Sequence, residues 1–144
     1  MSKVSVYLNF PGTTEEAFNF YKKVFRTEFT HEISRFGDIP PSAEMPPLSA
    51  SEKNKTMHVG LELLGGFELM GSDMPESMEK NLNQGNNVFI NLQPDTREET
   101  SRLFTALAEG GKILHQLQDT FWGAYYGSCV DKFGTHWSFN CEES

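Results

Sequence analysis

Apolar and polar residues alternate along the start of the chain, with a period of two that is typical of a β-strand with one buried face. The apolar positions are Val4, Val6, Leu8 and Phe10. A Pro11-Gly12 turn follows, and Thr13 and Glu16 have the spacing of an N-terminal capping box. Apolar residues then recur at helical spacing as Ala17, Phe20, Tyr21, Val24 and Phe25. The pattern predicts a strand followed by an amphipathic helix.

The same pair of elements returns in the second half of the chain. Val88, Ile90 and Leu92 alternate with polar or aromatic residues. Apolar residues at helical spacing follow, and a shift of 83 positions aligns Leu103 with Phe20 and Leu107 with Val24 of the first helix. Three further strands are predicted after each helix, at 28–36, 57–64 and 67–72 and at 112–117, 124–130 and 135–141. The sequence therefore predicts an α+β fold built from two βαβββ modules.

These modules cover about residues 1–73 and 86–141, and a polar segment over 74–85 links them. Residues 37–55 contain two proline pairs, which exclude regular structure, so a long lid or arm is expected there. Neither half could bury its sheet alone, so we expect one folding domain over residues 1–144.

Charge and composition restrict the classes of partner that the chain is expected to bind. The chain has 144 residues, with 12 Lys plus Arg against 20 Asp plus Glu, and a net charge of −8. Such a surface lacks the positive charge that nucleic acids and anionic membranes require. No apolar run approaches the ~20 residues of a membrane span, and the first residues lack the apolar region of a signal peptide. We expect a cytoplasmic protein with neither nucleic-acid nor membrane partners.

The last predicted hairpin determines the expected state of the two cysteines. A two-residue turn at Lys132-Phe133 places Cys129 opposite His136 and keeps it several rungs from Cys141, which predicts free thiols. The same pairing assigns one polar face of the hairpin, made of Tyr125, Cys129, His136, Ser138 and Asn140.

Several short motifs, in this order, resemble the vicinal oxygen chelate superfamily of glyoxalases, bleomycin-resistance proteins and extradiol dioxygenases. They include Tyr7-Leu8-Asn9-Phe10, Met57-His58-Val59, Leu69-Met70-Gly71-Ser72-Asp73, Gln118 to Gly123 and Asp131-Lys132-Phe133-Gly134. They are most similar to its PhnB-like branch, which also carries a 3-demethylubiquinone 3-methyltransferase label. The resemblance implies an open, cup-shaped mixed β-sheet barrel with helices outside, a central cavity and a homodimer.

In metal-using members of this superfamily, each module supplies one ligand from its first strand and one from its last. The corresponding first-strand positions here are near Ser5 or Val6 and near Asn87 or Val88. The last strands offer Glu68 and Ser138. Because Glu68 alone is a competent ligand, we expect no metal of the usual type and no cofactor.

The resemblance and the strand faces together predict the lining of a ligand cavity. Its expected residues are Tyr7, Asn9, Glu68, Met70, Phe89, Asn91, Tyr125, His136 and Asn140. Glu68 and His136 are the candidate catalytic residues, and apolar neighbours would raise the pKa of Glu68. A Gly65-Gly66 turn would place His58 opposite Asp73, either as a structural hydrogen bond or as a general-base pair.

Three functions remain open. The first is the binding of a small organic ligand in the cavity without the usual metal. The second is a metal-dependent lyase, isomerase or dioxygenase, so whether the protein is an enzyme stays undecided. The third is sequestration of a drug. Methyl transfer is disfavoured, since Gly12 is the only glycine placed where a nucleotide-binding turn would be, between the first strand and the first helix.

Overall fold

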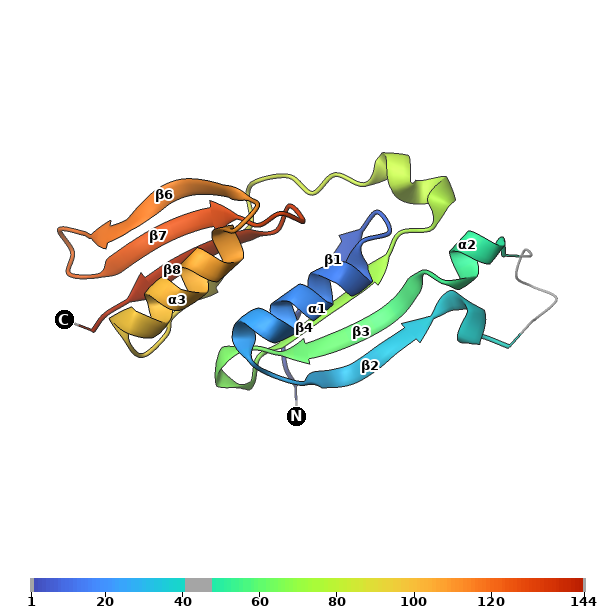
Figure 1. The fold of residues 1–144 in the computed structure, drawn as a ribbon, viewed down its shortest axis with the longest axis horizontal. Helices are drawn as coiled ribbons and strands as arrows, with labels where there is room; N and C mark the ends of the chain where they lie inside the picture. Colours follow the sequence, from blue (N-terminus) through green and yellow to red (C-terminus); the bar gives the residue numbers. More distant parts are fainter. Residues whose placement is uncertain (1, 41–47, 144) are drawn as a thin grey trace. The chain divides into compact units, whose positions relative to one another are not determined.

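The computed structural model describes residues 2–40 and 48–143. The chain divides into two compact units, Met1–Leu82 and Asn83–Ser144. Each unit contains one four-stranded sheet and one long helix (Figure 1).

The first unit has the strand order β1-β4-β3-β2. Its strands are β1 (Val6–Phe10), β2 (Phe29–Arg35), β3 (Thr56–Glu62) and β4 (Glu68–Asp73). Helix α1 (Thr14–Phe25) packs on one face of the sheet, where Phe18 and Tyr21 are fully buried with Leu61 and Leu69. We call the opposite face, which α1 does not cover, the first open face.

The second unit repeats this arrangement with the order β5-β8-β7-β6. Its strands are β5 (Ile90–Leu92), β6 (Lys112–Asp119), β7 (Tyr125–Val130) and β8 (His136–Cys141). Helix α3 (Arg97–Ala108) packs Leu103 and Leu107 against the face that holds Trp137 and Phe139. The face that α3 does not cover is the second open face.

Both units confirm the predicted α+β class. In each, the first strand pairs in parallel with the last, and the other pairs are antiparallel, so the sheets are mixed. Neither sheet closes on itself within its unit.

Both predicted hairpin registers were wrong by one residue. Val130, not Cys129, lies opposite His136, and Ser72, not Asp73, lies opposite His58. The reason is that each turn holds three residues: Asp131 N–H bonds the Thr135 carbonyl, and Leu63 N–H bonds the Phe67 carbonyl. Glycines with positive φ make these longer turns possible, as in Gly134 with φ of 92°.

In the observed register, the β7 residues of the second hairpin lie on the faces opposite to those predicted, whereas the β8 residues keep theirs. Cys129, Cys141 and Tyr125 lie on the side that faces α3, and Tyr126 replaces Tyr125 on the second open face with Asn140. Both cysteines are free, as predicted, and fully buried.

The predicted capping box at Thr13 was also wrong. The Thr13 side chain makes no cap hydrogen bond, and the buried Asp73 of β4 instead accepts from the Thr14 N–H at 3.0 Å. The other Asp73 oxygen accepts from the Thr56 N–H at 2.9 Å, so one carboxylate fixes the start of α1 and the start of β3. A side chain that is distant in sequence, and not the local motif, thus caps the start of the helix.

The predicted irregular segment over 37–55 is partly ordered. It contains the end of a 3-10 turn, Phe36–Asp38, and one helical turn, α2 (Ala50–Lys53), while its proline-rich part at 41–47 lies outside the described residues. The predicted linker contains a 3-10 segment, Glu76–Asn81. Within the described chain, no helix has the length and apolar character needed to cross a bilayer.

Candidate functional site

A polar cluster occupies the first open face around Glu68, the first residue of β4. The Glu68 side chain is 9% exposed. Its Oε2 accepts from the Thr30 hydroxyl at 2.5 Å and lies 3.0 Å from His31 Nδ1, and its Oε1 accepts from Lys3 Nζ at 3.1 Å. Three donors from β2 and from the segment before β1 therefore converge on one buried carboxylate.

Gly60 of β3 forms the floor of this cluster. A Cβ atom at this position would lie 2.6 Å from Thr30 Oγ1, 2.9 Å from His31 Nδ1 and 3.0 Å from Glu68 Oε2. The first two contacts are shorter than Cβ atoms normally make and the third is unusually tight, so any larger residue would push these side chains apart. The absence of a side chain at Gly60 is what allows Glu68, His31 and Thr30 to meet.

A second imidazole extends the cluster toward β1. His58 Nδ1 lies 3.3 Å from the Tyr7 hydroxyl, and the two rings stack with centroids 5.8 Å apart. The His58 ring also meets the His31 ring edge to face, with centroids 5.3 Å apart. Tyr7, His58, His31 and Glu68, one from each strand of the sheet, are thus linked by successive side-chain contacts, and we call this group the histidine row.

The electrostatics of Glu68 differ from the expectation. The Thr30 hydrogen bond is the largest influence and lowers the pKa of Glu68, burial opposes it, and Lys3 and His31 lower the pKa further. The predicted rise in pKa was wrong because polar donors, and not the neighbouring apolar residues, contact the carboxyl group. Glu68 is therefore a carboxylate that is held in place by the hydrogen bonds it accepts, and it is not suited to act as a proton donor.

The central contacts of the second open face are made by hydroxyl, amide and aromatic groups. Ser138 donates a hydrogen bond to Asn91 Oδ1 at 2.8 Å, and the His136 ring meets Phe89 edge to face at 5.1 Å. Asn140 lies opposite Tyr126 on the neighbouring strand. Among the residues that the structure describes, no carboxylate is hydrogen-bonded to His136, whereas His31 has Glu68 as its partner.

The two modules share one hydrogen-bonded pair. Ser72 donates to Asn9 in the first unit as Ser138 donates to Asn91 in the second, each between the first and last strands. In this alignment Ser138 corresponds to Ser72, and Glu68 corresponds to Gly134 in the last turn. In this alignment the second module has a glycine, and not a carboxylate, at the position that matches Glu68.

The predicted cavity residues are divided between the two open faces, with one exception. Tyr7, Asn9, Glu68 and Met70 share the first open face, and Asn91, His136 and Asn140 share the second, with Phe89 in ring contact with His136. Tyr125 instead faces α3, where its hydroxyl bonds Ser101 at 3.0 Å and its ring lies under the Arg97 guanidinium at 4.0 Å.

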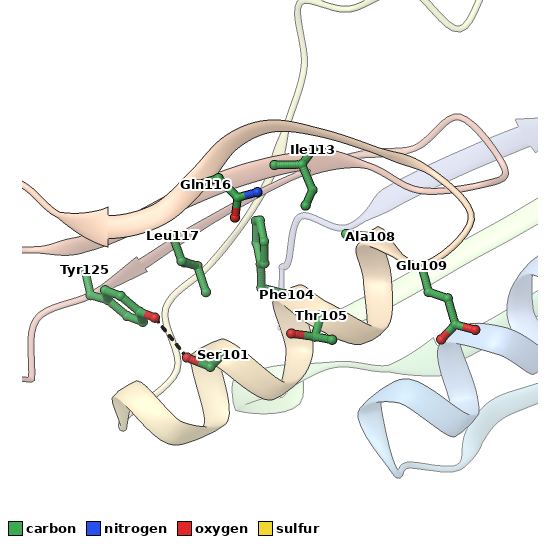
Figure 2. Close-up of a pocket in the computed structure, with 9 residues that line it drawn as sticks. All are labelled: Ser101, Phe104, Thr105, Ala108, Glu109, Ile113, Gln116, Leu117 and Tyr125. Carbon is green, nitrogen blue, oxygen red and sulfur yellow. Dashed lines mark hydrogen bonds between the residues drawn. The ribbon is translucent and has the colours of Figure 1, made fainter.

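Tyr125 lines a different cavity of about 540 Å³, between α3 and the edge strand β6 (Figure 2). Figure 2 shows the Ser101–Tyr125 hydrogen bond at one end and Phe104 pointing up toward the strands. The remaining lining residues are Thr105, Ala108, Glu109, Ile113, Gln116 and Leu117. This cavity holds neither of the two candidate catalytic residues.

Across the described part of the chain, His, Cys, Asp and Glu side chains do not gather in groups of three or more suited to a metal ion. Cys129 is an unsuitable nucleophile, because burial raises the pKa of its thiol to about 12.

Three members of the cluster were missed from the sequence: Lys3, Thr30 and His31. Thr30 and His31 are adjacent, so regular alternation would place them on opposite faces. The pairing of β2 with β3 is irregular between Phe29 and His31, and this bulge lets both side chains reach Glu68. The one available signal was Gly60 inside a strand pattern, which suggests a close approach.

Comparisons with known proteins agree with this architecture. The family model described as 3-demethylubiquinone-9 3-methyltransferase matches residues 2–139. Protein PA1353 from Pseudomonas aeruginosa is 34% identical with a TM-score of 0.80, and the match covers 100% of both chains.

Two further solved structures are similar at lower identity. A PhnB protein from Bacillus cereus is 26% identical with a TM-score of 0.72, over 97% of this chain and 99% of that one. A glyoxalase/bleomycin resistance protein/dioxygenase family enzyme from Burkholderia phytofirmans PsJN has a TM-score of 0.61 at 18% identity, over 95% and 97% of the two chains. The last likeness concerns the fold alone.

Proposed function

The chain belongs to the PhnB-like, 3-demethylubiquinone-9 3-methyltransferase-like family of the vicinal oxygen chelate superfamily, and from this premise we propose that it binds a small organic ligand through the histidine row of the first open face. One observation carries the proposal: Glu68, His31, His58 and Tyr7 present polar atoms and aromatic rings side by side. Such convergence of a few polar groups with aromatic surface is typical of small-molecule sites.

The chemistry of the row favours a planar ligand with a hydroxyl or carbonyl group. The Tyr7 ring, 47% exposed, offers a stacking surface. His31 is 58% exposed, and its ring is oriented by the Glu68 carboxylate, so it can donate or accept a hydrogen bond. Phenols, catechols and α-ketoaldehydes have these groups.

The family description names a methyl transfer, which the architecture does not favour. Both sheets are mixed and four-stranded, whereas nucleotide-cofactor enzymes of the doubly wound type have an extended parallel sheet. Binding, with or without turnover of the ligand, is the function that the open face supports best.

Two-dimensional NMR of the ¹⁵N-labelled protein in the presence of EDTA tests the proposal. We expect catechol or an α-ketoaldehyde to shift the amide signals of residues 30–31, 58 and 68, and the double variant Glu68→Gln with Tyr7→Ala to remove the shifts. Ala108→Trp, which fills the cavity between α3 and β6, is the matched control and should leave them unchanged. Shifts confined to residues 101–117, and lost in Ala108→Trp, would assign binding to that cavity and refute the proposal.

We also propose a cytoplasmic homodimer. The edge strand β6 supports the dimer, because Ile113 and Leu114 are 40% and 38% exposed on adjacent, oppositely directed positions. The two free cysteines support a reducing compartment. Light scattering at micromolar concentration should give twice the chain mass, and the mass of one chain would refute the dimer.

A further inference from the structure

We propose that His31 and His58 bind one borderline divalent cation, such as Zn²⁺, Ni²⁺ or Co²⁺, through their Nε2 atoms. The two residues stand on the paired strands β2 and β3, and their ring centroids lie 5.3 Å apart. Two imidazoles this close can contribute nitrogens to one ion, whose bonds to histidine are about 2.0–2.1 Å long. Imidazole nitrogen is a preferred ligand of these metals.

The hydrogen bonds of both rings have the pattern of metal-binding histidines. His31 Nδ1 lies 3.0 Å from the Glu68 carboxylate, and His58 Nδ1 lies 3.3 Å from the Tyr7 hydroxyl. With a proton on each Nδ1, these oxygens accept the hydrogen bonds and Nε2 carries the lone pair. A carboxylate or hydroxyl behind the ring fixes its tautomer and raises its basicity as a ligand. Among the described residues, no hydrogen bond occupies either Nε2.

The charge of the surroundings permits a cation. The Lys3 ammonium contacts Glu68 Oε1 at 3.1 Å. Glu68 thus neutralises Lys3 while its other oxygen holds His31. Water or oxygen atoms of a bound organic ligand can fill the remaining coordination positions. Coordination by an organic ligand rests on the function proposed above, whereas coordination by water does not.

The position differs from the one that the family resemblance implies. There, ligands come from the first and last strands of each module, whereas His31 and His58 lie on the second and third strands of one module. Glu68 would act as the residue that positions His31, not as a ligand.

Calorimetric titration of metal-free, tag-free protein with ZnCl₂ and NiCl₂ tests the proposal. We expect one ion per chain, and loss of measurable binding in both His31→Asn and His58→Asn. Glu68→Gln should weaken binding by about 10- to 100-fold, as for other residues behind a metal-bound histidine. MgCl₂, which prefers oxygen ligands, should give no heat.

The other two histidines provide matched controls. His115→Asn and His136→Asn, both in the second unit, should bind as the unchanged protein does. Binding that survives His31→Asn and His58→Asn, or absence of binding in the unchanged protein, would overturn the proposal. If either variant misfolds, the line broadening by Co²⁺ in NMR spectra of the unchanged protein decides: signals of residues 31 and 58 should broaden first, and broadening elsewhere refutes the site. The ligand test above contains EDTA, so the two proposals can fail separately.

Discussion

The first and second open faces have the same framework but different chemistry. In each, a serine of the last strand donates to an asparagine of the first, Ser72 to Asn9 and Ser138 to Asn91. Among the described residues, the first face alone adds a buried carboxylate, Glu68, with three donors around it. The two units thus share a framework, and in the first unit Glu68 and Gly60 add to it a buried, hydrogen-bonded polar cluster.

The buried aspartates differ in a similar way. Asp73 accepts two backbone N–H groups from residues far away in sequence, and so ties α1 and β3 to β4. Asp131 accepts the N–H groups of Phe133 and Thr135 in its own turn and Trp137 Nε1 at 2.8 Å. The first unit uses its aspartate for long-range order and the second for local order.

The largest expected effect is on Asp131. Replacing it by alanine leaves three N–H donors without their acceptor, two of them in buried bonds, and should lower the free energy of unfolding by about 3–5 kcal/mol. Asp73→Ala leaves two such donors and should cost about 2–4 kcal/mol. Urea unfolding followed by circular dichroism measures both, and an equal or reversed order would break the comparison.

Thiol labelling then distinguishes the units. Cys129 and Cys141 both lie in the second unit and are fully buried, and the Cys129 thiol has a pKa near 12, so the folded protein should resist thiol reagents at pH 8. Asp131→Ala should speed labelling more than Asp73→Ala does. Rapid labelling of the unchanged protein would contradict the burial of these thiols.

The next effect concerns the floor of the polar cluster. Gly60→Ala places a Cβ against Thr30, His31 and Glu68 and should cost about 1–3 kcal/mol through overpacking. Because Thr30 Oγ1 is the nearest atom, at 2.6 Å, the same substitution should cost less in a Thr30→Ala background. A double-mutant cycle in urea measures the coupling, and strictly additive costs would show that the cluster does not depend on Gly60.

The last prediction compares the two serine–asparagine hydrogen bonds that the units share. Ser138→Ala should cost about 1 kcal/mol, because Ser138 is 8% exposed and its bond is 2.8 Å long. Ser72 is half-buried with a 3.2 Å bond, so Ser72→Ala should cost about 0.5 kcal/mol or less. Thermal unfolding of the two variants gives the order, and a larger cost for Ser72→Ala would reverse our view of which pair is structural.

The repeat, the element order and the α+β class follow from the sequence, because alternation along β1 and helical spacing along α1 and α3 depend on local periodicity. It also placed Tyr7 and Asn9 on one face, since alternate residues of a regular strand share a face, whereas Glu68 was expected beside them from the family resemblance. Only the tertiary structure decided what contacts what.

Three-residue turns shifted both hairpins by one, and a one-residue shift moves a side chain such as Tyr125 to the opposite face. The bulge in β2 brought Thr30 and His31 together onto Glu68, although their adjacency in sequence predicts opposite faces. The missing side chain at Gly60 gave them room. These outcomes depend on turn length and on atoms from strands far apart in sequence, which a local pattern does not encode.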